Sequence, residues 1–185
     1  MRIWRYGLPE EETLNSSTVF DGRAVRLRID TVETADGRES TREIVEHDDC
    51  VTIIPVDEAD NVLFVRQYRK PVEKELLELP AGGIDPGEDA EAAVLREMQE
   101  ETGYLAGEVV RLGGFYSAPG YCTEYLHLYL ATGLTPSRLH AEDTAAITVE
   151  RVPVADIPRL LTSGRLEDAK SIAGLYMYLE YRRKG

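Results

Sequence analysis

Residues 82–104 read Gly82-Gly-Ile-Asp-Pro-Gly-Glu88-Asp-Ala-Glu-Ala-Ala-Val-Leu-Arg96-Glu97-Met-Gln-Glu100-Glu101-Thr-Gly103-Tyr104. The part from Glu88 to Thr102 is rich in Ala, Leu, Met, Glu and Arg, which favour a helix. Gly103 follows where many helices end on a left-handed residue. At 100° per residue, the glutamates at 97, 100 and 101 fall within about 100° of one another on this helix.

These three glutamates form an acidic stripe that invites two interpretations. Like charges at this spacing repel one another, so the stripe is mildly destabilising unless something binds it. Mg²⁺ prefers oxygen ligands and takes a few carboxylates together with waters and substrate phosphates. The alternative is a solvated acidic face, which is the commoner explanation for three glutamates on any helix.

The spacing of the surrounding residues favours the metal. The pattern consists of Gly, five residues, Glu, seven residues, Arg-Glu, two residues, Glu-Glu, one residue and Gly. A match to this whole pattern would arise by chance on the order of once in a million chains. The stretch resembles the Nudix hydrolase signature. The matching positions are Gly82, Glu88, Arg96, Glu97, Glu100, Glu101 and Gly103. Tyr104 departs from the signature, in which an aliphatic residue is usual.

The resemblance implies a loop–helix–loop that holds Mg²⁺ or Mn²⁺. By that resemblance, Glu97 and Glu101 are the principal ligands, Glu100 is an auxiliary ligand, and the backbone carbonyl of Ala81 adds another. Arg96 braces the glutamates by charge-assisted hydrogen bonds, and Gly82 and Glu88 support the site. The implied fold is the Nudix fold, an α/β/α sandwich with a mixed sheet.

Further segments resemble the ADP-ribose pyrophosphatase subgroup. They are Glu46-His47, Val65–Arg69, Glu78–Gly82, and Ser117–Gly120 followed by Glu124. Pro119 stands sixteen residues beyond Gly103, a position that this subgroup tends to mark with proline. The sequences that mark coenzyme A or NADH hydrolases in the superfamily are not visible.

The subgroup implies that water attacks one phosphorus of ADP-ribose, which gives AMP and ribose 5-phosphate. The general base is then expected on an acidic loop, with Glu142 as the first choice and Asp143 as the second. Arg69 is expected to face the substrate phosphates, and Arg42 is a second candidate. The alternative for each arginine is a surface residue in a weak ion pair.

Alternating patterns predict the rest of the fold. Strands are expected at 25–30, 51–56, 62–69, 112–116, 125–131 and 146–152, and helices at 154–161 and 167–182. Asp36-Gly37 is a hairpin turn signal. The sequence thus predicts an α+β domain at 48–185, with a small N-terminal antiparallel β-subdomain at 1–47. Because so small a sheet is marginal alone, it fits the homodimer that the resemblance implies, in which this sheet is exchanged and helps build the adenosine pocket.

Composition excludes several classes of function. The apolar fraction of 43% and the charged fraction of 30% are typical of a globular protein. A net charge of −13 argues against nucleic acid and anionic membrane surfaces as partners. A diphosphate is also an anion, so metal ions and a few arginines must neutralise it locally. The N-terminus lacks an apolar signal core, and Cys50 and Cys122 form no CxxC, so a cytoplasmic protein is expected.

Two other functions stay open. The chain could hydrolyse another nucleoside diphosphate sugar, such as GDP-mannose, because selectivity depends on pocket shape. It could also be a non-catalytic module that senses ADP-ribose, since the loop at 140–147 has few acidic residues. A Ser/His/Asp hydrolase is disfavoured, because no GxSxG occurs and the three histidines have no metal-ligand spacing.

Overall fold

The computed structural model describes residues 11–141 and 146–184, which divide into two compact units. The first unit is the chain up to His47 together with Ala118–Glu124. The second unit is Asp48–Ser117 together with the chain from Tyr125 onward.

The first unit is built on an antiparallel sheet of three strands. They are β1 (Glu12–Asp21), β2 (Arg26–Glu33) and β3 (Glu39–Glu46), in that order. Gly37 has a φ of +77° in the turn between β2 and β3, and its N–H donates to the Thr34 carbonyl at 2.8 Å. The predicted turn at Asp36-Gly37 is therefore confirmed.

A distant segment of the chain pairs with this sheet. The N–H of Val45 on β3 donates to the Tyr121 carbonyl at 2.7 Å, and the N–H of Thr123 donates to the Val45 carbonyl at 3.0 Å. The sequence did not assign residues 118–124 to the N-terminal unit, because this pairing joins residues more than 70 positions apart and leaves no local pattern.

The second unit contains a mixed sheet of four strands and an antiparallel sheet of three. The four-stranded sheet runs β7 (Ala81–Gly83), β4 (Cys50–Pro55), β10 (Tyr125–Thr132) and β9 (Glu108–Tyr116). Strands β4 and β10 are parallel and the other pairs are antiparallel. The second sheet runs β12 (Thr148–Pro153), β5 (Asn61–Arg69) and β6 (Lys74–Glu78). A short pair joins β8 (Tyr104–Leu105) to β11 (Thr135–Pro136).

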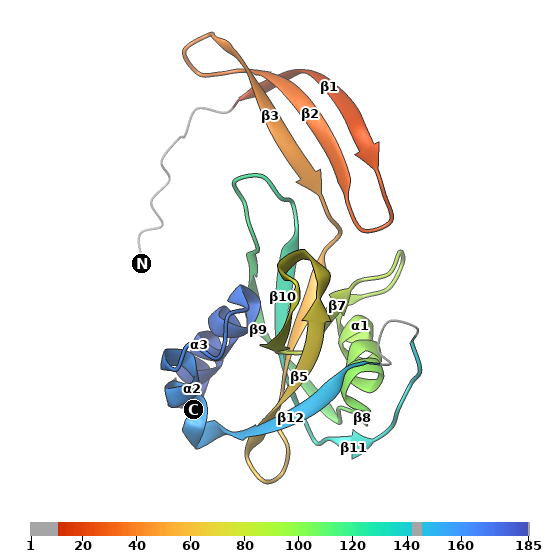
Figure 1. Cartoon of the computed structure of the whole chain (residues 1–185), viewed down its shortest axis with the longest axis vertical. Helices are drawn as coiled ribbons and strands as arrows, with labels where there is room; N and C mark the ends of the chain where they lie inside the picture. Colours follow the sequence, from red (N-terminus) through yellow and green to blue (C-terminus); the bar gives the residue numbers. More distant parts are fainter. Residues whose placement is uncertain (1–10, 142–145, 185) are drawn as a thin grey trace. The chain divides into compact units, whose positions relative to one another are not determined.

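Helices cover both faces of the four-stranded sheet, as Figure 1 shows for α1 on one side and α2 and α3 on the other. Their bounds are α1 Ala90–Glu97, α2 Ile157–Thr162 and α3 Ala169–Lys184, with short 3-10 turns η1 at Lys70–Val72 and η4 at Val154–Asp156. None of the helices in the described ranges is both long and apolar enough to cross a membrane.

Strand β4 lies at the centre of the core, and all six of its residues are buried. Ile54 packs in a cluster with Leu175 of α3, whereas Ile53 packs in a second cluster with Val94 of α1. Because neighbouring strand residues point to opposite faces, β4 is buried between the two helical layers. The predicted α+β architecture with a mixed sheet is confirmed.

The helix predicted at 88–102 has two parts. Helix α1 begins at Ala90, after Asp89, whose carboxylate accepts a hydrogen bond from the Ala92 N–H at 2.8 Å. After Glu97 the chain continues as a π-helical turn, η2 (Met98–Thr102), which ends at Gly103 with a φ of +78°. π-Helical turns are rare in proteins, and those that do occur are often found at functional sites.

Candidate metal and substrate site

The end of α1 and the turn η2 bring three carboxylates together. Glu97 and Glu101 are only 8% and 7% exposed, and Glu100 is partly exposed. Burial raises the pKa of Glu101 to about 8, and the negative charge of Glu97 acts in the same direction. Burial also raises the pKa of Glu97. These carboxylates are therefore costly to ionise together in the metal-free protein.

Arg96 connects these glutamates to the loop before the helix. Its Nε and Nη2 atoms donate to the two oxygens of Glu88 at 2.9 and 2.8 Å. Its Nη1 donates to Glu97 at 2.5 Å and to Glu100 at 3.3 Å, and Nη2 also donates to the Gly83 carbonyl at 2.8 Å. The guanidinium thus fixes the position of two stripe glutamates by charge-assisted bonds.

Strand β7 lies directly against the carboxylates. The Ala81 N–H donates to Oε2 of Glu101 at 3.0 Å. A Cβ atom at Gly82 would lie 2.0 Å from Cδ of Glu97, whereas a Cβ at Gly83 would have no atom within 4 Å. Gly82 is therefore required by a close approach of the backbone to Glu97, and Gly83 is not.

The donor set fits a hard divalent cation. The Arg96 guanidinium binds the carboxylates of Glu88, Glu97 and Glu100, and Glu101 interacts electrostatically with Glu97, so this group of acidic side chains offers only oxygen donors. A divalent cation among these carboxylates would favour their ionised forms, and so would oppose the burial and the charge of Glu97 that raise the pKa of Glu101. Oxygen ligands of this kind suit Mg²⁺ or Mn²⁺.

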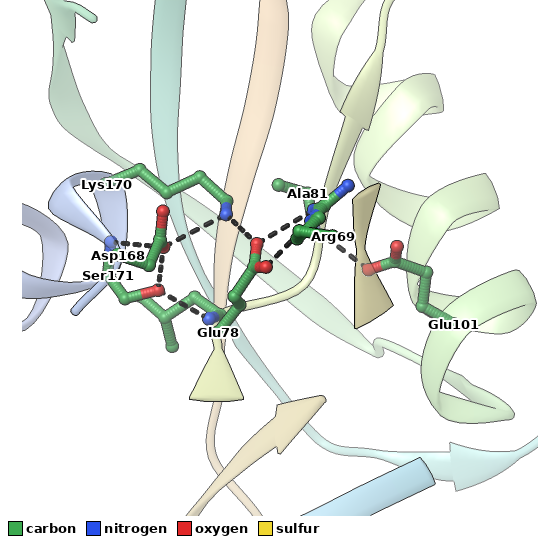
Figure 2. A network of polar contacts seen from close by, with 8 residues as sticks. Arg69, Glu78, Ala81, Glu101, Asp168, Lys170 and Ser171 are labelled. Atoms are coloured by element: carbon green, nitrogen blue, oxygen red, sulfur yellow. Dashed lines mark hydrogen bonds and ion pairs between the residues drawn. The ribbon is translucent and has the colours of Figure 1, made fainter. Parts of the chain in front are cut away.

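A second polar cluster lies beside the carboxylates, and the sequence did not predict it. Figure 2 shows Arg69, Glu78 and Lys170 grouped together. Arg69 Nε and Nη2 donate to the two oxygens of Glu78 at 2.7 and 2.8 Å, and Lys170 of α3 also donates to Glu78. Glu78 lies in the segment that resembles the subgroup, but Lys170 belongs to no motif, so only the structure reveals the pairing.

The beginning of α3 completes this cluster. Asp168 accepts hydrogen bonds from the N–H and the hydroxyl of Ser171, and from Lys170 at 3.0 Å. The Ser171 hydroxyl in turn accepts from the Leu79 N–H at 2.7 Å. Asp168 therefore holds the first turn of α3 next to the end of β6 (Figure 2).

The other predicted site residues fall in two places. Arg42 lies on β3 in the first unit, where its guanidinium donates to the carboxylate of Glu11, which raises its pKa. Glu142 and Asp143 lie outside the described residues. The proposed role of each of these residues stays a prediction.

Residues 46–175 match the family model described as NUDIX domain. The chain is 33% identical to an ADP-ribose pyrophosphatase of Bacillus subtilis, with 94% of each chain covered. It is 37% identical to an ADP-ribose pyrophosphatase of Mycobacterium tuberculosis, over 89% of this chain and 81% of that protein. It is also 34% identical to a methanol dehydrogenase activator of Bacillus methanolicus, over 92% of this chain and 94% of that protein.

The solved structures include a similar fold. A crystal structure of an ADP compounds hydrolase superposes with a TM-score of 0.88, is 25% identical in sequence, and covers 97% of both chains. The similarity extends over nearly the whole chain, so the fold predicted from the signature is confirmed.

Proposed function

The chain belongs to the Nudix hydrolase family, and from that premise we propose that it hydrolyses the diphosphate of ADP-ribose to AMP and ribose 5-phosphate. The observation that carries the proposal is the pair of buried carboxylates, Glu97 and Glu101, held beside β7 by Arg96 and Ala81. Two relatives that align over most of their length are named ADP-ribose pyrophosphatase. These relatives support ADP-ribose over other nucleotide sugars.

Nudix hydrolases generally use divalent metal ions. We propose Mg²⁺ or Mn²⁺ here, with Glu97 and Glu101 as principal ligands, Glu100 as an auxiliary ligand, and the Ala81 carbonyl as a further one. When bound, the metal would neutralise the diphosphate and lower the pKa of the attacking water.

The side chains have separate tasks in this proposal. Arg96 holds Glu97 and Glu100 in place, and the Ala81 N–H fixes one oxygen of Glu101. Arg69 donates to the diphosphate, and Arg42 is proposed as a second phosphate contact. Glu142 is the proposed general base and Asp143 the alternative; the residual rates of Glu142→Gln and Asp143→Asn distinguish the two. Placed cations are needed because the chain as a whole carries a net charge of −13.

Substrate choice is tested by a panel of nucleoside diphosphate sugars. We expect kcat/KM with Mg²⁺ to be at least about tenfold higher for ADP-ribose than for GDP-mannose. A preference of that size for GDP-mannose would overturn the choice of substrate but retain diphosphate hydrolysis. Tight binding of ADP-ribose with no metal-dependent turnover of any member would instead favour a sensor.

We also propose that the chain forms a homodimer through the N-terminal sheet. All ten residues of β1 are exposed, and Leu14, Val19 and Phe20 are large apolar side chains among them. A long exposed strand with apolar residues favours pairing with another chain. Light scattering after size-exclusion chromatography should give twice the chain mass of 20.7 kDa. Phe20→Glu should shift the protein toward the monomer, and a monomeric wild-type protein would refute the dimer.

A further inference from the structure

We propose that Glu78 is a positioning residue, which holds the guanidinium of Arg69 toward the substrate and is itself fixed by Lys170 of α3. The inference rests on the proposed function, because it assumes that Arg69 contacts the diphosphate. It adds a residue from β6 and one from the C-terminal helix to the machinery that the signature contains.

The geometry of the Arg69–Glu78 pair leaves part of the guanidinium available. The bidentate contact uses Nε and one hydrogen of Nη2. No acceptor in residues 11–141 or 146–184 binds Nη1. Three of the five N–H groups of Arg69 are thus available to an anion. The Arg69 side chain is 39% exposed, whereas that of Glu78 is 2% exposed, so the carboxylate forms a buried base beneath an accessible guanidinium.

Glu78 carries a negative charge despite its burial. Burial acts to raise its pKa, but the bonds from Arg69 and Lys170 outweigh burial and hold the pKa below its ordinary value. The carboxylate therefore lies between two cations that would otherwise repel each other. A neutral group at this position would lose the bidentate charge-assisted contact that orients Arg69.

Two contacts connect this pair to rigid elements. Lys170 is held by Asp168 at 3.0 Å in the first turn of α3, and Ser171 in the same turn binds the backbone N–H of Leu79 at 2.7 Å. Leu79 is the residue next to Glu78, so both the side chain and the backbone of Glu78 are anchored to α3. Because Glu78 is fixed in this way, the Arg69 guanidinium that it binds is already ordered and loses little conformational entropy when substrate binds.

The cluster also lies within electrostatic reach of the proposed metal ligands. Arg69 and Lys170 both act to lower the pKa of Glu101, and Glu101 contributes to raising the pKa of Arg69 after the larger effect of Glu78. The guanidinium is thus placed between the buried Glu78 and the carboxylate of Glu101 (Figure 2). A diphosphate bound at the metal would meet the available N–H groups of Arg69.

The test is Glu78→Gln, which keeps the shape of the side chain but presents an N–H₂ group to the donors of Arg69 or Lys170. We expect KM for ADP-ribose to rise at least about tenfold while kcat stays within about threefold, because binding of the substrate phosphates is weakened. The Kd for Mn²⁺ without nucleotide should stay within about twofold, since the metal ligands are unchanged. The matched control is Glu150→Gln. Glu150 of β12 accepts a hydrogen bond at 2.7 Å from Arg66, which lies on β5 like Arg69 but three residues away, and therefore on the opposite face of the strand. The KM of this control should equal that of the wild type.

A double-mutant cycle separates positioning from general stability. In an Arg69→Met background, Glu78→Gln should change KM by less than about twofold, because no guanidinium remains to be positioned. If the KM increases of the two single variants multiply in full in the double variant, the inference is overturned. An unchanged KM in Glu78→Gln would also overturn it. If Glu78→Gln does not fold, Glu78→Asp keeps the charge but shortens the reach, and it should show the same rise in KM.

The proposed hydrolase function and the positioning role of Glu78 can be refuted separately. Wild-type protein that binds ADP-ribose in Mg²⁺ but does not hydrolyse it would refute the hydrolase. The same cycle, measured then as calorimetric Kd values, would still support or overturn the positioning role. Wild-type protein that neither binds nor cleaves ADP-ribose would refute both.

Discussion

Replacing Glu101 with Gln is expected to lower kcat at least about a hundredfold, by analogy with removing a major electrostatic group from an active site. Glu97→Gln should do the same, because both carboxylates are buried beside β7 and bound by groups that hold their position. The measurement is steady-state hydrolysis of ADP-ribose in Mg²⁺, with Mn²⁺ affinity followed by calorimetry.

The matched control is Glu91→Gln, since Glu91 is an exposed glutamate in the first turn of the same helix. Its rate should stay within about twofold of the wild type, as for most surface substitutions. Near-normal rates in both Glu97→Gln and Glu101→Gln would remove the assignment of the metal site.

The Glu101→Gln variant should also change how stability depends on pH. In the metal-free protein the pKa of Glu101 is about 8, above its ordinary value of 4.5. Between these values the folded state keeps a proton that the unfolded chain has released, so the free energy of unfolding falls as pH rises from about 4.5 to 8. Thermal unfolding in EDTA should show a smaller fall for Glu101→Gln, and the variant should be more stable than the wild type at pH 8. An equal fall in both proteins would contradict the raised pKa of Glu101 in the folded, metal-free protein.

Gly82→Ala is expected to impair the same site without adding or removing a charge. The new Cβ would lie 2.0 Å from Cδ of Glu97, so the carboxylate must leave its place beside Arg96. We expect kcat/KM to fall at least about a hundredfold and Mn²⁺ affinity to weaken, because a displaced ligand loses its geometry.

Gly83→Ala provides the control one residue further along β7. A Cβ there has no atom within 4 Å, so activity and unfolding temperature should stay close to those of the wild type. Equal activities in the two alanine variants would contradict the close approach of β7 to Glu97.

Much of the second unit could be predicted because its strands carry a burial signal. Strand β10, predicted at 125–131, runs from Tyr125 to Thr132, and its Leu128 and Tyr129 pack in different core clusters. Strand β1 carries no such signal, because all its residues are exposed and the sequence ETLNSSTVFD does not alternate. Burial makes a strand visible in a sequence, because it selects apolar residues at the buried positions.

The helix of the signature shows a different limit. Its composition predicts a helix but cannot distinguish an i→i+4 from an i→i+5 pattern, so the π-helical turn at Met98–Thr102 was not predicted. Glu88 was also expected within the helix. It lies before the N-cap because its carboxylate binds the Asp85 N–H and Arg96 instead.

The site likewise contains residues that the sequence could bring together and residues that it could not. The glutamates and Arg96 come together because they lie within one helical segment, where spacing determines proximity. Lys170 contacts Glu78 across 92 positions, and only the packing of α3 against the sheets creates that contact. Tertiary contacts of this kind leave no trace in one sequence.

The central claim is metal-dependent cleavage of a diphosphate at the glutamates of α1 and η2. Its most direct test is chromatography of the products after purified protein is incubated with ADP-ribose, with Mg²⁺ in one sample and EDTA in another. We expect AMP and ribose 5-phosphate with Mg²⁺, neither product with EDTA, and almost none with Glu101→Gln in Mg²⁺. AMP formed equally in EDTA, or formed at the wild-type rate by Glu101→Gln, would contradict the claim.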